Sequence, residues 1–333
     1  MDEVEKYIQL VMREHTITST PILIGTSGML GSEFRSYFGE LDRSFFPLSR
    51  PSFDISDRES VRKRLLLLKS LGADSVLNCA AATDVSGIEL DPRLANESFR
   101  ANVLGPRYLA ETCEDLGLRL IHFSTDYVYS QHSLDTKIFQ DEFPVNLYGT
   151  HKLLGEKYIQ STMRSGNYAI VRIGCLYGAF GKKSFLHKFL RNACKAKLAG
   201  PETVNVIDFQ EATPTSTRYV VFRIDTFLGD NAFSGTFSLS PSGSATRAKF
   251  AERILLELEA VGIGTLSGIK VRPVDSESGF LPSTSVLDTM NRTTHLGGKG
   301  DISWESDLRQ FVALNKSSLK RFLEGCLLKE EGN

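Results

Sequence analysis

A tyrosine and a lysine spaced four residues apart form the pair in this chain best suited to acid–base chemistry. They are Tyr148 and Lys152, in the segment Tyr-Gly-Thr-His-Lys. On a helix, positions i and i+4 lie on one face, so both side chains are expected to reach one pocket. A free tyrosine has a pKa near ~10, and an ammonium ~4 Å away would lower that pKa by roughly three units, partly opposed by desolvation. The pair therefore predicts a proton donor to an alkoxide, or a base in the reverse reaction.

A segment with several hydroxyl groups precedes this pair. Ser124, Thr125, Asp126 and Tyr127 follow an apolar run that predicts a strand. Ligands of open α/β sheets gather at the carboxyl ends of strands. We expect the Thr125 hydroxyl to hydrogen-bond a reacting carbonyl and to share its developing charge with Tyr148. The alternative is that these residues only cap and turn the chain.

Three glycines near the amino terminus predict a dinucleotide-binding turn. Gly25, Gly28 and Gly31 follow the apolar segment Pro-Ile-Leu-Ile and open a predicted helix. Glycines allow a tight turn and a close approach to a pyrophosphate, and the helix N-terminus offers N–H groups and the positive end of a dipole. We assign Gly25, Ser27 and Gly28 to a bound cofactor. A purely structural turn is the alternative.

The end of the second predicted strand bears on which dinucleotide binds. An acidic residue there would favour NAD, because it binds the ribose hydroxyls. This chain has Arg50 instead, whose planar fork suits a 2′-phosphate. Asp54 is the nearest carboxylate. NADP is therefore the expected cofactor, while NAD, or a merely solvated arginine at position 50, stays open.

Alternating strand and helix patterns are expected to position these residues. Strands are predicted at 21–24, 44–48, 75–78, 119–123 and 168–172, and helices at 30–39, 57–71, 93–117 and 148–164. This alternation predicts an α/β fold, a Rossmann-like doubly wound parallel sheet with helices on both faces. Further on, the pattern predicts helices at 185–198 and 247–260 and a strand at 236–239.

The looser pattern beyond residue 175 predicts a smaller C-terminal substrate-binding lobe. We expect an N-terminal extension at 1–20, which carries Val4, Ile8 and Val11 at helical spacing. The NAD(P)-binding Rossmann domain would take 21–174 and 216–240. The substrate-binding lobe would take 175–215 and 241–333.

Composition excludes several classes of partner. The chain has 333 residues and a formal net charge of -1, so no basic field predicts nucleic acid as a partner. No apolar run approaches the ~18 residues that cross a bilayer, and no secretory signal is recognisable. The five cysteines are scattered without a Cys-x-x-Cys spacing. A reducing compartment, the cytoplasm, is expected, and a homodimer is compatible with the sequence.

Taken together, these motifs resemble the dTDP-4-dehydrorhamnose reductase family of extended short-chain dehydrogenases/reductases. The resemblance covers residues 21–320 and is carried by several segments. These are Gly25–Gly31, Asn78–Thr83, Ser124–Val128, Tyr148–Glu156, Arg172–Gly178, Pro214-Thr215 and Ser285–Asp288. It implies NADPH- or NADH-dependent reduction of a 4-keto sugar on a nucleoside diphosphate.

The resemblance also implies roles for individual residues. Tyr148 would be the proton donor, Lys152 its partner, and Thr125 the hydroxyl on the substrate carbonyl. The candidate cofactor contacts are Gly25, Ser27, Gly28, Met29, Leu30, Arg50, Asp54, Ile55, Ala80, Ala81, Ala82, Asn102, Tyr148 and Lys152. The candidate substrate contacts are Val85, Thr125, Asp126 and Cys175. Related 4,6-dehydratases have a glutamate where this chain has Tyr127, which favours reduction over dehydration here.

Several positions depart from the family pattern. Cys175 stands near the place of a tryptophan that lies beside the sugar, and a thiol cannot cover a pyranose face. Leu281 replaces an arginine. Glu33 matches a glutamate that binds Mg²⁺ in some relatives, but one carboxylate is not a metal site, so no metal is expected. His151 is expected to face outward from its helix, away from Tyr148 and Lys152.

These departures leave a second function open. The methionine adenosyltransferase beta subunit resembles the same family, so a cofactor-binding regulatory subunit is the alternative to an enzyme. The presence of Tyr148, Lys152 and Thr125 favours the enzyme. The changes at Cys175 and Leu281 favour a different role.

Overall fold

A parallel six-stranded sheet forms the centre of the computed structural model, which describes residues 19–129, 142–181, 184–200, 202–228, 233–275, 284–287 and 302–330. The strand order is β10-β5-β4-β3-β1-β2. The strands are β1 (Pro21–Ile24), β2 (Phe46–Leu48), β3 (Ser75–Asn78), β4 (Arg119–Thr125), β5 (Tyr168–Ile173) and β10 (Gly235–Ser238). All neighbouring pairs run parallel. The chain passes to opposite sides of β1 to form β2 and β3, so the topological switch point lies between β1 and β3.

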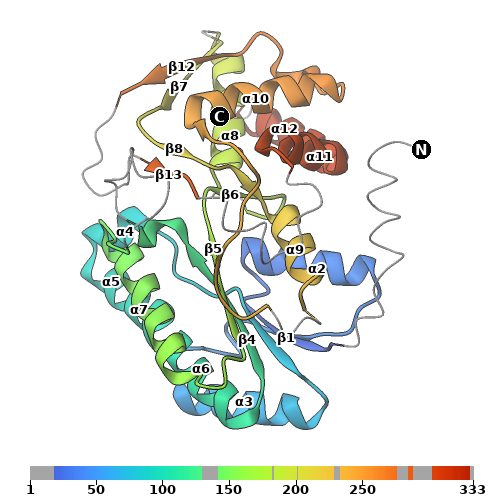
Figure 1. The fold of residues 1–333 in the computed structure, drawn as a ribbon. Helices are drawn as coiled ribbons and strands as arrows, with labels where there is room; N and C mark the ends of the chain where they lie inside the picture. Colours follow the sequence, from blue (N-terminus) through green and yellow to red (C-terminus); the bar gives the residue numbers. More distant parts are fainter. Residues whose placement is uncertain are drawn as a thin grey trace.

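Helices cover both faces of this sheet (Figure 1). One face carries α3 (Arg58–Ser70), α6 (Gly105–Leu116) and α7 (Leu147–Thr162), and the other carries α2 (Met29–Glu40) and α9 (Thr217–Asp225). Side chains of a strand alternate between the two faces. Ile22 and Ile24 accordingly join the core under α3 and α6, while Leu23 joins the core under α2 and α9. Short helices α4 (Val85–Leu90) and α5 (Pro92–Phe99) follow β3.

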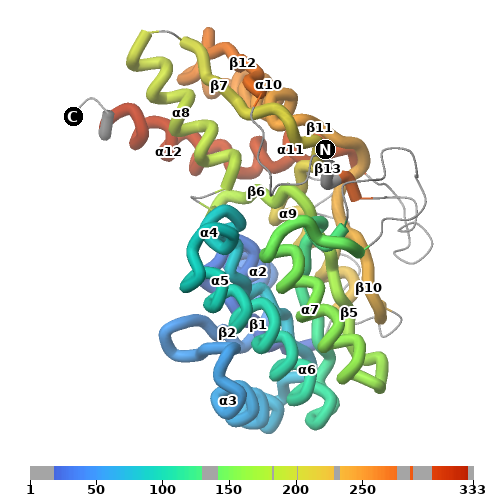
Figure 2. Tube along the Cα trace, turned by 90° about the vertical axis from the view of Figure 1, so that its left-hand side faces the viewer, coloured from blue at the N-terminus to red at the C-terminus, as the bar shows by residue number. Residues whose placement is uncertain are grey.

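A second group of elements lies at one end of the sheet, where Figures 1 and 2 show it apart from the sheet's helical layers. Its longer elements are α8 (Phe185–Ala199), α10 (Arg247–Ala260), α11 (Trp304–Leu314), α12 (Lys316–Glu330), β7 (Thr203–Ile207) and β12 (Lys270–Val274). Its short elements are β6 (Leu176–Tyr177), β8 (Glu211–Ala212), β9 (Thr215–Ser216), β11 (Ala245–Thr246), β13 (Thr284–Ser285), and the 3₁₀ turn η3 (Gly264–Leu266). All of the longer elements, together with β6, β11 and η3, share one hydrophobic core around Tyr177, Phe250 and Trp304. We propose the domain limits given above on this basis, with the chain returning to the sheet at β10.

The expected helix over 93–117 is wrong in detail. The structure divides it into α5, a π-helical segment η1 (Arg100–Leu104) and α6. A π-helical turn inserts an extra residue per turn and is frequent at functional sites. It turns Asn102 inward, where the side chain is 1% exposed.

The remaining predicted strands and helices agree with the structure only in part. The six expected strands of the sheet are confirmed, and their ends differ by at most two residues. Helices α9, α11 and α12 were not expected. The helix suggested by Val4, Ile8 and Val11 lies outside the described residues, as does Leu281. Among the helices in the described part of the chain, none is long and apolar enough to span a bilayer.

Candidate functional site

The loops after β1 and β3 meet at the topological switch point. Gly25 has φ of 83°, and a Cβ atom there would lie 2.8 Å from the backbone nitrogen of Ala80. Only glycine combines this left-handed conformation with so close a contact. The glycine turn therefore lies directly against the Ala80 segment, and the two loops line the crevice where α/β sheets bind dinucleotides.

The N-terminus of α2 faces the same glycine turn. Gly28 is its N-cap residue, and no side chain caps the helix there. Ser27 and Gly28 are exposed, Met29 is partly buried and Leu30 is buried. Backbone N–H groups at an N-terminus of this kind bind phosphate without help from a side chain.

Two asparagines hold the loop after β3. Asn78 accepts a hydrogen bond from the Ala80 backbone N–H at 3.2 Å. Asn102 accepts from the Ala82 N–H at 3.0 Å and donates to the Ala82 carbonyl at 2.9 Å. The Asn102 amide is thus used to fix Ala82, while Ala81 is exposed and Val85 begins α4. The role expected for Asn102 at the cofactor remains a proposal.

Helix α7 brings Tyr148 to the carboxyl end of β4. Asn146 caps α7 by accepting from the Gly149 N–H at 2.7 Å. A Cβ atom on Gly149 would lie 2.2 Å from the Tyr127 carbonyl oxygen, so glycine allows the helix to contact this backbone directly. As a result, the rings of Tyr127 and Tyr148 pack edge to face, with their centroids 6.0 Å apart.

The Thr125 side chain lies close enough to the Tyr148 phenol to act on its pKa, which it lowers. Thr125 ends β4 and donates to the Asp126 carboxylate at 2.9 Å. Thr125 and Asp126 are buried, whereas Tyr148 is partly buried. The structure thus brings together a phenol and a hydroxyl that the sequence assigned to one carbonyl group.

The expectation that Lys152 brings the pKa of Tyr148 below its ordinary value is wrong, because that pKa is raised. Burial raises the pKa of Tyr148, the Thr125 side chain opposes this rise, and Asp126 and Tyr127 add to it. The Lys152 amino group instead contacts the Phe123 carbonyl at 2.6 Å and His122 Nε2 at 3.1 Å. Although positions 148 and 152 share a helix face, the long lysine stem lies along β4 and its amine is used there.

A buried ion pair anchors the middle of α7 to the sheet. Glu156 is 0% exposed and pairs with Arg172 of β5, whose Nη2 lies 2.5 Å from its carboxylate. Ser124 of β4 also donates to Glu156. Removing one partner of a buried pair typically costs roughly 3–5 kcal/mol of stability, so these contacts hold α7 firmly against β4 and β5.

Two residues of the second group of elements reach this site, and the sequence had not indicated either. Gln210 donates to the Tyr127 hydroxyl at 3.2 Å, and Arg247, the first residue of α10, donates to Gln210 at 2.7 Å. Burial raises the pKa of Tyr127 to about 12, Asp126 adds to this, and Gln210 and Arg247 oppose it. The residues around Arg247 in the sequence do not indicate a site, because Arg247 reaches Gln210 only when α10 packs in the folded chain.

Cys175 lies beside the same residues. It is partly buried and has φ of 39°, which is uncommon for a residue other than glycine. Burial raises the pKa of its thiol to about 12, with Arg247 opposing and Asp126 adding to the shift. It is therefore a protonated, weakly polar group at neutral pH.

The candidate adenosine contacts lie beyond β2. Arg50 and Asp54 are exposed, whereas Ile55 is buried. Asp54 accepts from the Ser56 N–H at 2.9 Å. Their exposure leaves both charged groups accessible to a ligand.

The structure gives Glu33 and His151 definite contacts. Glu33 accepts from Thr217 at 2.8 Å and lies 3.7 Å from Arg218. No group of three metal-ligating side chains occurs among the residues that the structure describes. The outward position expected for His151 is wrong, because its Nδ1 lies 3.0 Å from Ser98 Oγ and its ring packs against Phe99.

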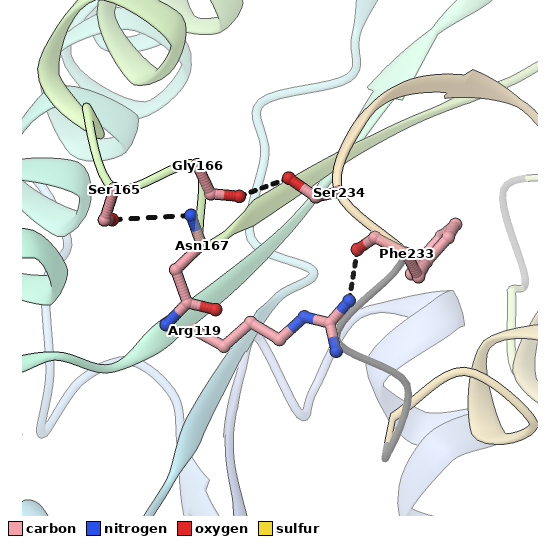
Figure 3. A pocket seen from close by; sticks show the side chains of 6 residues that line it. All are labelled: Arg119, Ser165, Gly166, Asn167, Phe233 and Ser234. Carbon is pink, nitrogen blue, oxygen red and sulfur yellow. Dashed lines mark hydrogen bonds between the residues drawn. The ribbon is translucent and has the colours of Figure 1, made fainter.

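A separate cavity lies at the opposite end of the strands from the candidate site (Figure 3). It is lined by Arg119, Ser165, Gly166, Asn167, Phe233 and Ser234. These residues lie at the amino ends of β4, β5 and β10. Because ligands of such sheets bind at the carboxyl ends, this cavity is not the crevice described above.

Comparison with known proteins gives consistent matches. The family model described as "RmlD substrate binding domain" matches residues 20–316. A dTDP-4-dehydrorhamnose reductase of Streptomyces griseus is 33% identical over 276 residues, which is 80% of this chain and 84% of that protein. A probable low-salt glycan biosynthesis reductase, Agl14, of Haloferax volcanii is 31% identical over 288 residues, which is 82% of this chain and 91% of that protein.

A solved structure has the same fold. It is a dTDP-4-dehydrorhamnose reductase of Bacillus anthracis in complex with NADP, with a TM-score of 0.75 and 23% identity. The match covers 90% of this chain and all of that chain.

The contact between Gly149 and Tyr127 can be tested by adding one methyl group. We expect Gly149→Ala to lower the free energy of unfolding by about 1–3 kcal/mol, because the methyl group overlaps the Tyr127 carbonyl. Gly39→Ala is the matched control, since Gly39 is also helical and has nothing within 4 Å of an added Cβ. In Gly39→Ala the free energy of unfolding should rise by up to about 1 kcal/mol, because alanine has the higher helix propensity. Urea denaturation measures both, and equal effects of the two substitutions would contradict the close contact.

Proposed function

Because the chain belongs to the dTDP-4-dehydrorhamnose reductase family, we propose that it reduces the 4-keto group of a sugar linked to a nucleoside diphosphate, with NADPH as the reductant. The observation that carries the proposal is that the Tyr148 phenol and the Thr125 hydroxyl lie together at the carboxyl end of β4. Its named relatives are reductases, and one of the solved structures with this fold holds NADP.

The crevice between β1 and β3 fits a dinucleotide. The glycine turn leaves the N-terminus of α2 without a capping side chain, which suits a pyrophosphate. The Ala80–Ala82 segment is held rigidly by Asn78 and Asn102. NADPH bound there would supply the hydride. Arg50 is exposed after β2, where it could pair with a 2′-phosphate.

Tyr148 is proposed to donate the proton. Because burial raises its pKa, the phenol is protonated at neutral pH. An alkoxide that develops on the substrate is a stronger base than a phenolate, so a tightly held phenolic proton still transfers to it. With Tyr148 beside Thr125, two hydroxyl groups lie where they can share one carbonyl oxygen.

Tyr127 supports reduction rather than elimination of water. Its hydroxyl accepts from Gln210, and burial raises its pKa to about 12, so it cannot act as a base near neutrality. The nearby Asp126 carboxylate accepts from Thr125. We assign Asp126 and Cys175 to the sugar side of the site.

Arg247 is proposed to bind the diphosphate of the substrate. It is partly buried, contacts Gln210, and opposes the rise that burial causes in the pKa values of Tyr127 and Cys175. The ion pairs found within the described part of the chain do not include Arg247, which leaves its charge for a ligand. A guanidinium binds phosphate oxygens through its planar fork.

Replacing the proposed proton donor should abolish turnover and spare the cofactor. We expect Tyr148→Phe to lower kcat roughly 10²–10⁴-fold with an unchanged Kd for NADPH. Tyr158→Phe is the matched control, because Tyr158 is a more exposed tyrosine on α7. Oxidation of NADPH, followed by its absorbance with a panel of 4-keto nucleotide sugars, measures both variants. Turnover close to normal in Tyr148→Phe would contradict the assignment.

The same assay separates the enzyme from a regulatory subunit. An enzyme oxidises NADPH with at least one sugar of the panel. If the unmodified chain oxidises NADPH with none of the sugars and co-purifies tightly with another protein, the regulatory function is favoured.

Arg50 should confer a preference for NADPH. We expect kcat/KM to be higher for NADPH than for NADH, because NADPH alone carries the 2′-phosphate that the guanidinium would bind with a charge-assisted contact. Arg50→Ala should reduce the ratio of the two kcat/KM values. Initial rates with the two cofactors measure the ratio. A ratio well below one in the unmodified chain would reject this preference.

Arg247 should affect substrate binding more than the chemical step. We expect Arg247→Gln to raise KM for the nucleotide sugar roughly tenfold or more, because a charge-assisted hydrogen bond is lost, with kcat little changed. Arg247→Lys keeps the charge and should recover part of the affinity. A KM for Arg247→Gln equal to that of the unmodified chain would exclude a diphosphate contact.

A further inference from the structure

A chain of buried polar groups leads from the loop after β3 to Lys152. Asn78 and His122 are 0% exposed and Lys152 is 1% exposed. Asn78 Nδ2 lies 2.9 Å from His122 Nδ1, and His122 Nε2 lies 3.1 Å from Lys152 Nζ. At the other end, Asn78 Oδ1 accepts from the Ala80 N–H at 3.2 Å.

The backbone N–H of Ala80 sets the direction of every hydrogen bond in this chain. An amide N–H can only donate, so the Asn78 oxygen must face it and the Asn78 NH₂ must face His122. His122 Nδ1 must then accept. In a neutral imidazole the proton is consequently on Nε2, and this N–H points at Lys152.

An ammonium group on Lys152 conflicts with that direction, because it has three donors and no acceptor. Turning the Asn78 amide does not remove the conflict, since it would place the NH₂ group against the Ala80 N–H. Protonating the imidazole adds another donor, and burial holds the pKa of His122 well below its ordinary value. A neutral amine satisfies every contact: it accepts from His122 and donates to the Phe123 carbonyl at 2.6 Å.

We propose that Asn78 and His122 form an oriented hydrogen-bond chain that favours the uncharged amine of Lys152, and that His122 is a positioning residue for Lys152. The charge on Lys152 then changes near neutral pH instead of being permanent. This goes beyond the proposed reaction, because it concerns the resting state of the lysine and needs no substrate.

The other groups facing Lys152 do not reverse this preference. Burial lowers its pKa to about 8, and Glu156 on α7 and Cys79 after β3 oppose that shift. The Glu156 carboxylate is engaged by Arg172 and Ser124, and burial raises the pKa of the Cys79 thiol, which is therefore neutral at pH 7. The hydrogen-bond chain from Asn78 acts in the same direction as burial.

The titration of Lys152 can be followed directly in the full chain. Lysine labelled with ¹³C at the ε carbon reports its charge by NMR, and Lys152→Met identifies the signal by its loss. We expect Lys152 to titrate at about pH 8 or below. In His122→Gln the side-chain amide is free to turn its oxygen toward Lys152, so the ammonium gains an acceptor. The midpoint should rise by about one pH unit or more.

A second histidine supplies the matched control. His151 is a neighbour of Lys152 on α7, but its Nδ1 contacts Ser98. His151→Gln should leave the Lys152 midpoint unchanged. An unchanged or lower midpoint in His122→Gln would overturn the proposal, as would a Lys152 in the unmodified chain that titrates with the exposed lysines.

Asn78→Asp tests the same chain if His122→Gln does not fold, as judged by circular dichroism. A carboxylate accepts from both the Ala80 N–H and His122, so the imidazole proton moves to Nδ1 and Nε2 can accept from an ammonium. The Lys152 midpoint should rise in this variant too, and a midpoint that does not rise counts against the proposal. None of these readouts requires turnover, so failure of the reductase proposal would be seen separately.

Discussion

The packing of helix α7 against strand β4 is the constraint on which the candidate site depends. Successive turns of the helix contact successive parts of the strand and the turn that follows it. Gly149 lies against the Tyr127 carbonyl, Lys152 binds the Phe123 carbonyl, and Glu156 accepts from Ser124. These contacts fix the position of the helix along its axis and its rotation about that axis, and so place Tyr148 beside Thr125.

Burial, more than the pairing of opposite charges, sets the protonation of Tyr148 and Lys152. It raises the pKa of Tyr148 and lowers that of Lys152, so both groups move toward their neutral forms. A charged lysine close to the phenol would have stabilised a phenolate. The structure instead has a protonated phenol and an amine of adjustable charge, an arrangement suited to donating a proton to a strongly basic oxygen.

The second group of elements completes the site from the other side. Gln210 reaches across to Tyr127, Arg247 binds Gln210, and Cys175 lies where the chain leaves β5. These residues differ in kind from those of the crevice: the crevice consists of glycine, alanine and asparagine near the backbone, whereas this side offers a guanidinium, an amide and a thiol. The division is expected if the crevice holds a common cofactor and the second group selects the substrate.

The sequence by itself determined the features that depend on local spacing. The strands and the glycine turn at Gly25 follow from hydrophobic patterning and from residues that tolerate unusual backbone angles. The spacing of Tyr148 and Lys152 placed both on one helix face. Only the tertiary structure decided what each side chain contacts, because partners such as His122 for Lys152, or Arg247 for Gln210, lie far apart along the chain. Burial, which sets the direction of each pKa shift, likewise exists only once the helices have packed on the sheet.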